Sequence, residues 1–459
     1  MATPAPRSVP TQPLLLDLDG LAVARVERLE DGTRRVHLVT TEEGARACPK
    51  CGVLSSRVKG SAITRPRDLP IGERGLELVW RKRRWYCREP LCAAKSFTEQ
   101  VRQVPARARI TRRLRDAAGQ RVCDAGSTVI QAARDLHLSW PTVMEAFRTV
   151  GTEVMTAALE PVAVLGIDET RRGRTQWRQN PDTGRWEPVA NQWHTGFVDA
   201  FGVQGLLGQV EGRAPSDVLA WLNTTPLQWR KQIRYVAIDM STSYRAAVRT
   251  GLPHATVVVD HFHVVQLANK MLNTVRRRTT ASLRGRRGTA TDPEWKARRR
   301  LLRNREDLTD QQFAAMWNAL IDAGTIGMTL LTAWIAKERL RNLLATARTG
   351  ADFHRIGHLR WKFLTWCADS GIPEVRQLAT TVDRWWPEIA AFIATGHSNA
   401  KSEGVNRVIK LVARAAHGFR NPANQRLRTR CATTRRARGH LNPTLKPQGS
   451  EQTGDRILR

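Results

Sequence analysis

Residues 161–170 read PVAVLGIDET, a short run of apolar residues that ends on Asp168. Apolar and β-branched residues in a run of this length indicate a buried strand. Four later stretches have the same character: NQWHTGFVDA (191–200), FGVQGLLGQVEGR (201–213), IRYVAIDMS (233–241) and HATVVVDHFHVV (254–265). Two intervening stretches indicate helices: APSDVLAWLNTT (214–225) and STSYRAAVRTGLP (241–253). This order predicts an α/β fold, in which helices pack against a mixed sheet.

Acidic residues stand at the ends of three of these predicted strands. Asp168, Asp239 and Asp260 each follow an apolar run, and ligands of open α/β sheets bind outside the carboxyl ends of the strands. A buried carboxylate is costly unless it is paired, hydrogen-bonded or bound to a metal. Carboxylate oxygens at such an edge suit Mg²⁺. Alternatively, each acid caps the helix that follows it, as Asp239 could do before STSY.

A late helix carries a further acid among basic residues. The stretch HSNAKSEGVNRVIKLVARAAHGF (397–419) has a helical period. One face gathers the apolar residues Val405, Val408, Ile409, Val412 and Ala416. The opposite face gathers Asn399, Glu403, Arg407, Lys410 and Arg414. A carboxylate in this stripe could hold a metal while its neighbours bind backbone phosphates. Alternatively, Glu403 makes an ordinary ion pair with Arg407 on a solvated face.

The charge balance of the 459-residue chain points to a polyanionic partner. Lys and Arg number 74 against 42 acids, so the formal net charge is +32 and the isoelectric point is near 11.3. Basic blocks stand at 81–84, 276–278 and 298–300. They favour nucleic acid as the partner, although an Arg-rich coding bias would also raise the charge. Because we find neither a signal peptide nor a membrane-spanning run, we expect a cytoplasmic protein without membrane association.

Four of the seven cysteines form two close pairs. Cys48 and Cys51 lie in CPKCG, and Cys87 and Cys92 follow the strand-like run LELVWRKRRWY. In a reducing compartment such pairs indicate metal rather than disulfide, and together they can form a tetrahedral Zn²⁺ site. The wider second spacing leaves open the alternative of reduced thiols in a small β domain. The metal interpretation predicts a module that depends on zinc for its stability.

The stretch STVIQAARDLHLSWPTVMEAFRTVG (127–151) predicts a helix-turn-helix. Ser127 can cap a first helix, residues 137–139 form a break, and a second helix begins near Pro141. Any helical hairpin shares this pattern, but the basic context favours DNA binding. The residues expected near the exposed start of the second helix, where base edges are read, are Trp140, Thr142 and Glu145.

The order of these elements resembles that of the RNase H-like DDE transposases, with acids after the first and fourth strands and a Glu on a late helix. The resemblance to the ISL-three family of bacterial insertion-sequence transposases is carried by GIDE (166–169), DHFH (260–263), SNAKSEGVNRVIK (398–410) and HGFRN (417–421), behind a Cys-paired basic module. It covers most of residues 40 to 430. Two features depart from it. The stretch 171–188 lengthens the first hairpin, and Ala400 stands where the family more often has Gly.

The resemblance implies a catalytic triad of Asp168, Asp239 and Glu403. These acids would hold two Mg²⁺ ions, with Mn²⁺ as an alternative. A competing assignment makes Asp260 the second acid. We prefer Asp239, because the second acid of this fold follows the fourth strand.

The resemblance also implies supporting residues around this triad. Asp260 and His263 match an Asp-x-x-His signature, which suggests a hydrogen bond between them that fixes the end of the fifth strand. We expect Asn399 and Asn406 on the late helix to support the site as well.

The sequence divides into five expected parts. They are an N-terminal segment at 1–40, a zinc-binding module at 41–105, a helix-turn-helix DNA-binding domain at 106–155, an RNase H-like domain at 160–432 and a basic disordered tail at 433–459. A largely helical insertion at 264–395 would account for the long stretch of sequence that separates Asp239 from Glu403.

The implied function is metal-dependent cleavage of the ends of an insertion sequence and their transfer to new DNA. The DNA partner would be double-stranded and would include both the terminal inverted repeats and the target. Cutting two ends together would require a homodimer or higher oligomer of the chain on DNA. The protein would then be associated with the bacterial nucleoid. Arg407, Lys410 and Arg414 would grip phosphates. Three alternatives remain: a DNA-binding regulator, a structure-specific nuclease or resolvase, and a decayed or domesticated transposase.

Overall fold

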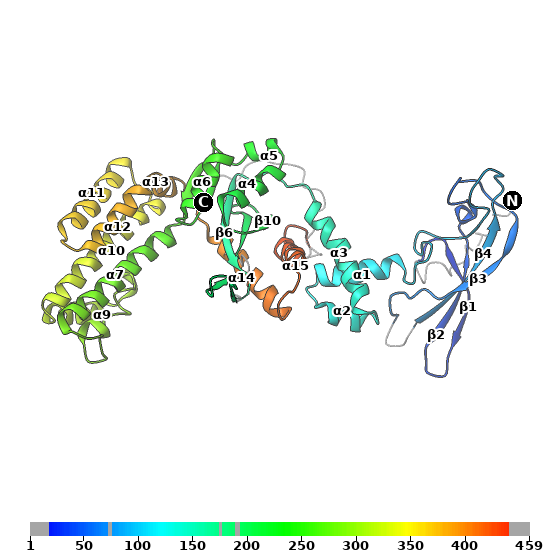
Figure 1. Cartoon of the computed structure of the whole chain (residues 1–459), viewed down its shortest axis with the longest axis horizontal. Coiled ribbons are helices and arrows are strands. Elements are labelled where there is room, and N and C mark those ends of the chain that lie inside the picture. The colour runs from blue at the N-terminus through cyan, green and yellow to red at the C-terminus, as the bar shows by residue number, and fades with distance from the viewer. Residues whose placement is uncertain (1–17, 72–75, 174–176, 189–192, 440–459) are drawn as a thin grey trace, which may run out of the picture. The chain divides into compact units, whose positions relative to one another are not determined.

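The structure is a computed structural model that describes residues 18–71, 76–173, 177–188 and 193–439 (Figure 1). The chain separates into two compact units. The first comprises Met1–Ala157 and Asn421–Ala432, and the second comprises Ala158–Arg420 and Thr433–Arg459. Among the described residues we find no helix with the length and apolar character that crossing a bilayer requires. Most of the expected disordered tail, residues 440–459, lies outside the described residues.

The first unit begins with a five-stranded sheet. Its elements are β1 (Leu21–Arg28), β2 (Arg34–Thr40), η1 (Glu43–Arg46), β3 (Val58–Thr64), β4 (Leu76–Tyr86) and β5 (Ser96–Thr98), where η1 is a 3-10 helix. The strand order is β1-β2-β4-β3, and β5 also pairs with β4. Leu38, Leu78 and Trp80 form part of its buried core. The sheet therefore includes two strands from the segment 1–40, which the sequence did not connect with the cysteines.

Three helices follow the sheet: α1 (Arg112–Cys123), α2 (Val129–Asp135) and α3 (Trp140–Thr156). Thr128, rather than the expected Ser127, caps α2, because its hydroxyl accepts a backbone hydrogen bond from the first turn. The hydroxyl of Ser139 accepts from the N–H of Thr142 and so starts α3. The predicted helix-turn-helix is present, and α1 packs on α3 as a further helix.

A helix from the far end of the sequence completes this helical bundle. It is α15 (Pro422–Thr434), and its Leu427 and Cys431 pack in the same apolar core as α1, α2 and α3. Arg428 donates hydrogen bonds to the carbonyl oxygens of Val122 at 2.8 Å and Gly126 at 3.1 Å. These bonds satisfy carbonyl groups at the end of α1 and in the loop that follows. Sequence periodicity did not reveal this long-range packing.

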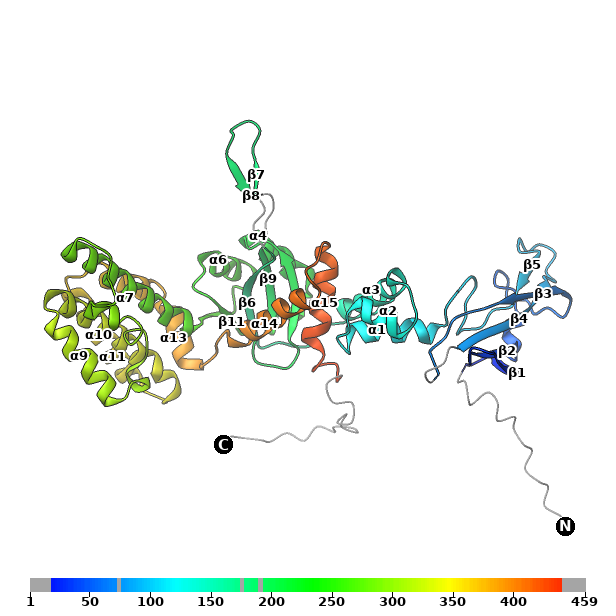
Figure 2. The same cartoon turned by 90° about the horizontal axis from the view of Figure 1, so that it is seen from below.

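The second unit contains a five-stranded mixed sheet, of which Figure 2 labels β6, β9 and β11. Its strands are β6 (Val164–Arg171), β9 (Trp193–Asp199), β10 (Leu206–Glu211), β11 (Tyr235–Ile238) and β12 (Thr256–Val259). Their order is β10-β9-β6-β11-β12, in which β9 is antiparallel to both neighbours and β6, β11 and β12 are parallel. The five strands are those that the sequence predicted, and they form a mixed sheet of the expected α/β class. Leu165, Val236 and Val258 are fully buried, as parallel strands covered on both faces require.

Shorter elements connect these strands. The helices are α4 (Pro215–Thr224), α5 (Leu227–Lys231) and α6 (Thr242–Gly251). The lengthened first hairpin forms a separate two-stranded sheet of β7 (Trp177–Gln179) and β8 (Trp186–Pro188), between β6 and β9 in the sequence.

A helical insertion follows β12, as expected. Its elements are α7 (His261–Arg284), α8 (Pro293–Lys296), η2 (Arg305–Asp307), α9 (Asp310–Asp322), α10 (Thr325–Ala345), η3 (Thr346–Arg348), α11 (Phe353–Asp369), α12 (Pro373–Arg384) and α13 (Trp386–Thr395). The prediction of a strand up to Val265 is wrong beyond Val259, because the Asp260 side chain caps α7. Glu388 on α13 is buried and lies 3.0 Å from Arg249 of α6, which fastens the insertion to the sheet domain.

After the insertion, α14 (Ala400–Ala415) returns to the sheet. Its Val405 and Ile409 pack with Val198 of β9 and Leu206 of β10. The approach to β6 is close at Gly166, where a Cβ atom would lie 2.4 Å from the Ser402 hydroxyl oxygen. Only glycine therefore fits at this point of the strand. The close contact brings the polar residues of α14 to the end of β6.

Candidate active site and metal centre

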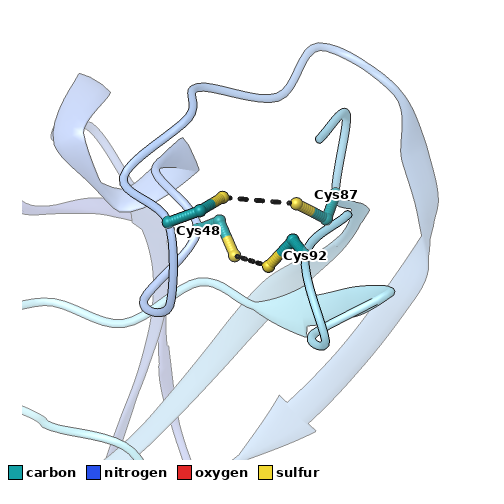
Figure 3. A group of neighbouring side chains, drawn as sticks. Cys48, Cys87 and Cys92 are labelled. Atoms are coloured by element: carbon teal, nitrogen blue, oxygen red, sulfur yellow. Dashed lines mark hydrogen bonds between the residues drawn. The ribbon is translucent and has the colours of Figure 1, made fainter. Parts of the chain in front are cut away.

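The four predicted zinc-binding cysteines come together beyond the end of β4. Their sulfur atoms all lie within 4.8 Å of one another, with 3.8 Å between Cys48 and Cys92 and 3.5 Å between Cys51 and Cys87. Figure 3 shows the thiols of Cys48, Cys87 and Cys92 facing one another. Zn–S bonds of about 2.3 Å in a tetrahedron separate the sulfurs by about 3.8 Å, whereas a disulfide requires about 2 Å. The spacing fits a structural zinc ion.

The surroundings favour the thiolate at Cys48 but not at every cysteine. Backbone hydrogen bonds lower the pKa of Cys51 and of Cys87, but burial and the thiols of Cys48 and Cys92 outweigh them, so both pKa values are raised. Burial opposes ionisation of Cys48, but hydrogen bonds from the backbone N–H groups of Lys50 and Cys51 lower the pKa of its thiol to about 7. A thiolate is the form that binds zinc. The buried side chains packed with the cysteines include Trp85 and Phe97, so this end of the sheet has a small apolar core.

Asp168 and Asp239 lie at the same edge of the second sheet. In the parallel pair of β6 and β11, Ile167 is opposite Ile238, so the next residues, Asp168 and Asp239, lie at the same level. Asp239 follows β11, but β6 does not end on Asp168 as expected, because it continues to Arg171 in its pairing with β9. Burial, followed by the nearby carboxylate of Asp239, raises the pKa of Asp168 to about 7. The neighbouring charge disfavours ionisation of Asp168, and a bound cation would reverse that effect.

Helix α14 holds Asp168 in place. The side-chain amide of Asn406 donates a hydrogen bond to Oδ2 of Asp168 at 2.6 Å. The other carboxylate oxygen accepts from the N–H of Glu169 at 2.7 Å. The orientation of Asp168 is therefore fixed from both β6 and α14, and Asn406 lies where a supporting residue was expected.

His263 lies between the other two acids. Its Nε2 atom is 2.9 Å from Oδ1 of Asp239 and 3.9 Å from Oε1 of Glu403. The interaction with Asp239 raises the pKa of His263. The expected side-chain hydrogen bond between Asp260 and His263 is not formed. The reason is that α7 begins at His261, and its first turn carries the imidazole of His263 to Asp239.

Asp260 instead serves as a structural anchor. Its Oδ1 accepts from the N–H of Phe262 at 3.0 Å, and its Oδ2 accepts from the N–H of Asn399 at 3.2 Å. The side chain of Asn399 in turn donates to the carbonyl oxygen of Ile167 at 3.1 Å. Asp260 and Asn399 are almost completely buried. Together they join the end of β6 to the first residues of α7 and α14.

Asp260→Ala is expected to destabilise the start of α7 by about 1–3 kcal/mol, because it removes both a helix cap and a buried acceptor. Asp352→Ala is the matched control, since Asp352 caps α11 from an exposed position and its loss should cost about 1 kcal/mol. Hydrogen exchange at the first turn of each helix measures both effects. Equal losses in the two variants would contradict the anchoring role of Asp260.

The same anchor predicts a dependence on pH. Burial works against the Asp260 carboxylate, yet the His261 ring and the N–H of Phe262 hold its pKa below the usual range. The stability that ionised Asp260 contributes is then present above its unfolded pKa of about 3.9 and is lost as the pH falls through the lower folded value. Wild type and Asp260→Ala should therefore differ less in hydrogen exchange at the first turn of α7 below about pH 4 than at neutral pH.

The donor chemistry at the sheet edge suits a hard divalent cation. Asp168, Asp239 and Glu403 offer only carboxylate oxygens, and Oδ1 of Asp239 is buried with no well-aligned hydrogen bond despite its short distance to His263. Among the described residues, only the four cysteines place all their ligand atoms within 4.8 Å of one another. The three carboxylates are therefore spread more widely than the ligands of one compact ion site.

Family models match successive parts of the chain. A transposase model of the DDE type from the ISL3 family matches residues 165–429. The chain belongs to the ISL3 family of transposases. The model for the zinc-finger of transposases IS204, IS1001, IS1096 and IS1165 matches residues 45–92. The model for the helix-turn-helix domain of transposase family ISL3 matches residues 99–151. The resemblance seen in the sequence is thus confirmed.

The chain is also similar to individual transposases. The transposase for insertion sequence element IS1001 of Bordetella parapertussis is 28% identical over 427 residues, which cover 91% of this chain and 97% of the relative. The transposase for IS1557 of Mycobacterium tuberculosis (strain H37Rv) is 29% identical over 214 residues, or 42% of this chain and 46% of the relative. The solved Drosophila P element transposase strand transfer complex matches with a TM-score of 0.37 and 9% identity, over 72% of this chain and 93% of that chain.

Residues expected to contact DNA lie on two helices of this ISL3 family member. On α14, Arg407, Lys410 and Arg414 are all exposed. They follow Glu403 along the helix, so a row of cations leads away from that acid. Asn399, which the sequence placed on the same face, is instead buried and directly precedes the helix.

At the start of α3, the three expected residues differ in their surroundings. Trp140 is 51% exposed. The hydroxyl of Thr142 lies 2.8 Å from that of Ser139 within the helix cap. Glu145 is exposed and lies 3.6 Å from Arg148. Trp140 and Glu145 are therefore open to a ligand, while the Thr142 hydroxyl already has a partner.

Sequence analysis did not single out Gly166 or Ser402 near the site. Both lie where α14 crosses β6, and Ser402 is completely buried. A glycine inside an apolar strand, two residues before an acid, is a signal of close backbone approach. That signal was present in GIDE but indicated no particular partner.

Proposed function

We propose that this protein cuts the ends of an insertion sequence and joins them to new DNA, with Asp168, Asp239 and Glu403 as the catalytic acids. The observation that supports this most is that His263 lies between Asp239 and Glu403 while Asn406 of α14 donates to Asp168 on β6. Membership of a transposase family gives the reaction class. The detailed roles of residues follow from the geometry of the second unit.

The three acids would hold two divalent cations, Mg²⁺ or Mn²⁺, which supply Lewis-acid stabilisation and activate the attacking oxygen. Their wide spacing is suited to ligands shared between two ions about 4 Å apart. Within the chain itself, Asn406 orients Asp168 and His263 orients Asp239. Water, and later a DNA 3′ hydroxyl, would serve as nucleophile, so no covalent protein intermediate is required.

Recognition of the DNA would be divided between specific and nonspecific contacts. The zinc-binding module and the helix-turn-helix would bind the terminal inverted repeats, with Trp140 and Glu145 at the start of α3 near the base edges. Arg407, Lys410 and Arg414 would contact phosphates without reading sequence. Cutting two ends together would require a homodimer or larger assembly on DNA, in the nucleoid of a bacterial cell.

The proposal is tested by incubating the full-length protein with a labelled fragment that carries the end of its own element and Mg²⁺. We expect a nick at the boundary of the terminal repeat and, with target DNA present, joined products. Binding without cleavage in both Mg²⁺ and Mn²⁺ would favour a DNA-binding regulator or an inactive transposase. Cleavage of branched DNA irrespective of the repeat would favour a nuclease or resolvase.

Asn406→Ala is expected to lower the cleavage rate about 10- to 100-fold and to raise the Mg²⁺ concentration needed for half-maximal rate, because loss of a residue that orients a metal ligand weakens metal binding by this order. Asn424→Ala is a control, since Asn424 is a half-buried helical asparagine on α15 whose side chain accepts from Arg148 and contacts no proposed metal ligand. The measurement is the Mg²⁺ dependence of single-turnover cleavage. A lower rate with an unchanged Mg²⁺ dependence would contradict this positioning role.

A further inference from the structure

A pocket of about 260 Å³ lies at the start of α14, apart from the acids. Its lining includes Phe201 from the turn between β9 and β10, His397 and Ser398 from the turn before α14, and Lys401 from the first turn of α14. Val164, at the beginning of β6, also lines it. The pocket is therefore four residues, or about 13 Å, along β6 from Asp168.

One side of the pocket is aromatic and open. Phe201 is 74% exposed and meets the ring of His397 edge-on, with centroids 5.5 Å apart. His397 in turn lies against Tyr235 at 4.9 Å. Burial, followed by the charge of Arg234, lowers the pKa of His397, so the ring is uncharged near neutral pH. An exposed ring backed by a fixed aromatic neighbour can stack on a planar ligand.

The other side of the pocket is positively charged. Lys401 makes no ion pair with any described residue, and the Ser398 hydroxyl also lines the cavity. The side chain of Asn399 forms no cap for this 16-residue helix, and within its first turn the N–H groups of Ser402 and Glu403 donate to the carbonyl oxygen of Asn399. The positive end of the helix dipole adds to the ammonium charge of Lys401.

We propose that this pocket holds one nucleotide of an unpaired DNA strand. Its base would stack on Phe201, and its phosphate would lie between Lys401 and the first turn of α14. The inference rests on the proposed function, because Lys401 and Glu403 share one helical turn and a strand held here leads toward the acids. Stacking accepts any base, so the pocket would capture a melted DNA end irrespective of its sequence.

The test compares two fluorescent probes, a blunt duplex and the same duplex with a short single-stranded 3′ end of thymines. Phe201→Ala should weaken binding of the tailed duplex about tenfold and leave the blunt duplex unchanged. Val203→Ala is the matched control, because Val203 is 65% exposed in the same turn and does not line the pocket. Both variants should bind the blunt duplex as wild type does.

A second variant separates the phosphate contact from the stacking contact. For the tailed duplex, Lys401→Gln should make the slope of the logarithm of the binding constant against the logarithm of the salt concentration shallower by about 0.7. The slope for the blunt duplex should not change. Lys410→Gln, later on the exposed face of α14, should affect both probes alike. The inference is overturned if Phe201→Ala and Val203→Ala behave identically, or if Lys401→Gln weakens both probes equally. Failure of the proposed function itself would appear separately, as absence of element-end cleavage by wild type.

Discussion

Asp239→Asn and Glu403→Gln are each expected to lower the rate of element-end cleavage at least about a thousandfold while leaving DNA binding intact. Stabilisation by a bound cation contributes several kcal/mol, and about 4 kcal/mol corresponds to a thousandfold in rate. Both replacements keep the shape of the side chain beside His263 and remove only its charge. The measurement is single-turnover cleavage of a labelled element end in Mg²⁺, with binding followed by gel shift.

Asp260→Asn is the control for this experiment, because it tests the competing choice of second acid. Both oxygens of Asp260 accept backbone hydrogen bonds, and its side chain is 2% exposed. We therefore expect Asp260→Asn to retain measurable cutting, with a loss well below that of Asp239→Asn. Retained cutting by Asp239→Asn together with abolished cutting by Asp260→Asn would reverse the assignment.

The strands of the RNase H-like sheet could be predicted from the sequence because burial on both faces leaves a simple signal. PVAVLGI and YVAI are continuous apolar runs bounded by polar residues, and parallel central strands have this composition. The same signal failed at DHFHVV. Val264 and Val265 extend the apolar run, but Asp260 ends the strand by capping α7, and a cap depends on local hydrogen bonding that periodicity does not register.

Contacts between distant parts of the chain were less predictable. The attachment of α15 to the helix-turn-helix bundle involves Arg428 and carbonyl groups more than 300 residues earlier, and no local pattern specifies such a partner. The same holds for β1 and β2, whose place beside β4 depends on a parallel pairing between Arg34 and Leu76. Alternation indicates that a strand exists, but it does not indicate which strand it pairs with.

At the candidate site, residue types were predictable and their pairings were not. Strand ends and a helical stripe indicated four candidate acids, Asp168, Asp239, Asp260 and Glu403. The family resemblance then implied Asp168, Asp239 and Glu403 as the triad. The partner of His263 depends on where α7 begins, and one misplaced helix boundary assigned the ring to Asp260 instead of Asp239. This change of partner matters for function, because it places His263 between two proposed metal ligands instead of beside a peripheral supporting residue.

Removing zinc is expected to unfold the cysteine end of the first sheet and to abolish specific binding of element ends. In zinc-finger peptides a structural zinc contributes about 10 kcal/mol or more to folding. The core here is small, since Cys48 and Cys92 themselves form part of the cluster around Trp85 and Phe97. Without the metal, those two aromatic side chains alone cannot offset the entropy of ordering the surrounding loops. A chelator should therefore expose Trp85 and shift its fluorescence.

Cys48→Ser should reproduce the effect of the chelator, whereas Cys367→Ala should retain wild-type zinc content, because Cys367 is a buried thiol of α11. The loss of structure should also be confined to the cysteine end of the sheet. Leu38, Leu78, Trp80 and their neighbours form a separate core around β1, β2 and β4, so hydrogen exchange there should change little when the cysteine end opens. Uniform loss of protection across the whole sheet would show that zinc supports one cooperative unit, and unchanged protection at the cysteines would contradict a structural zinc site.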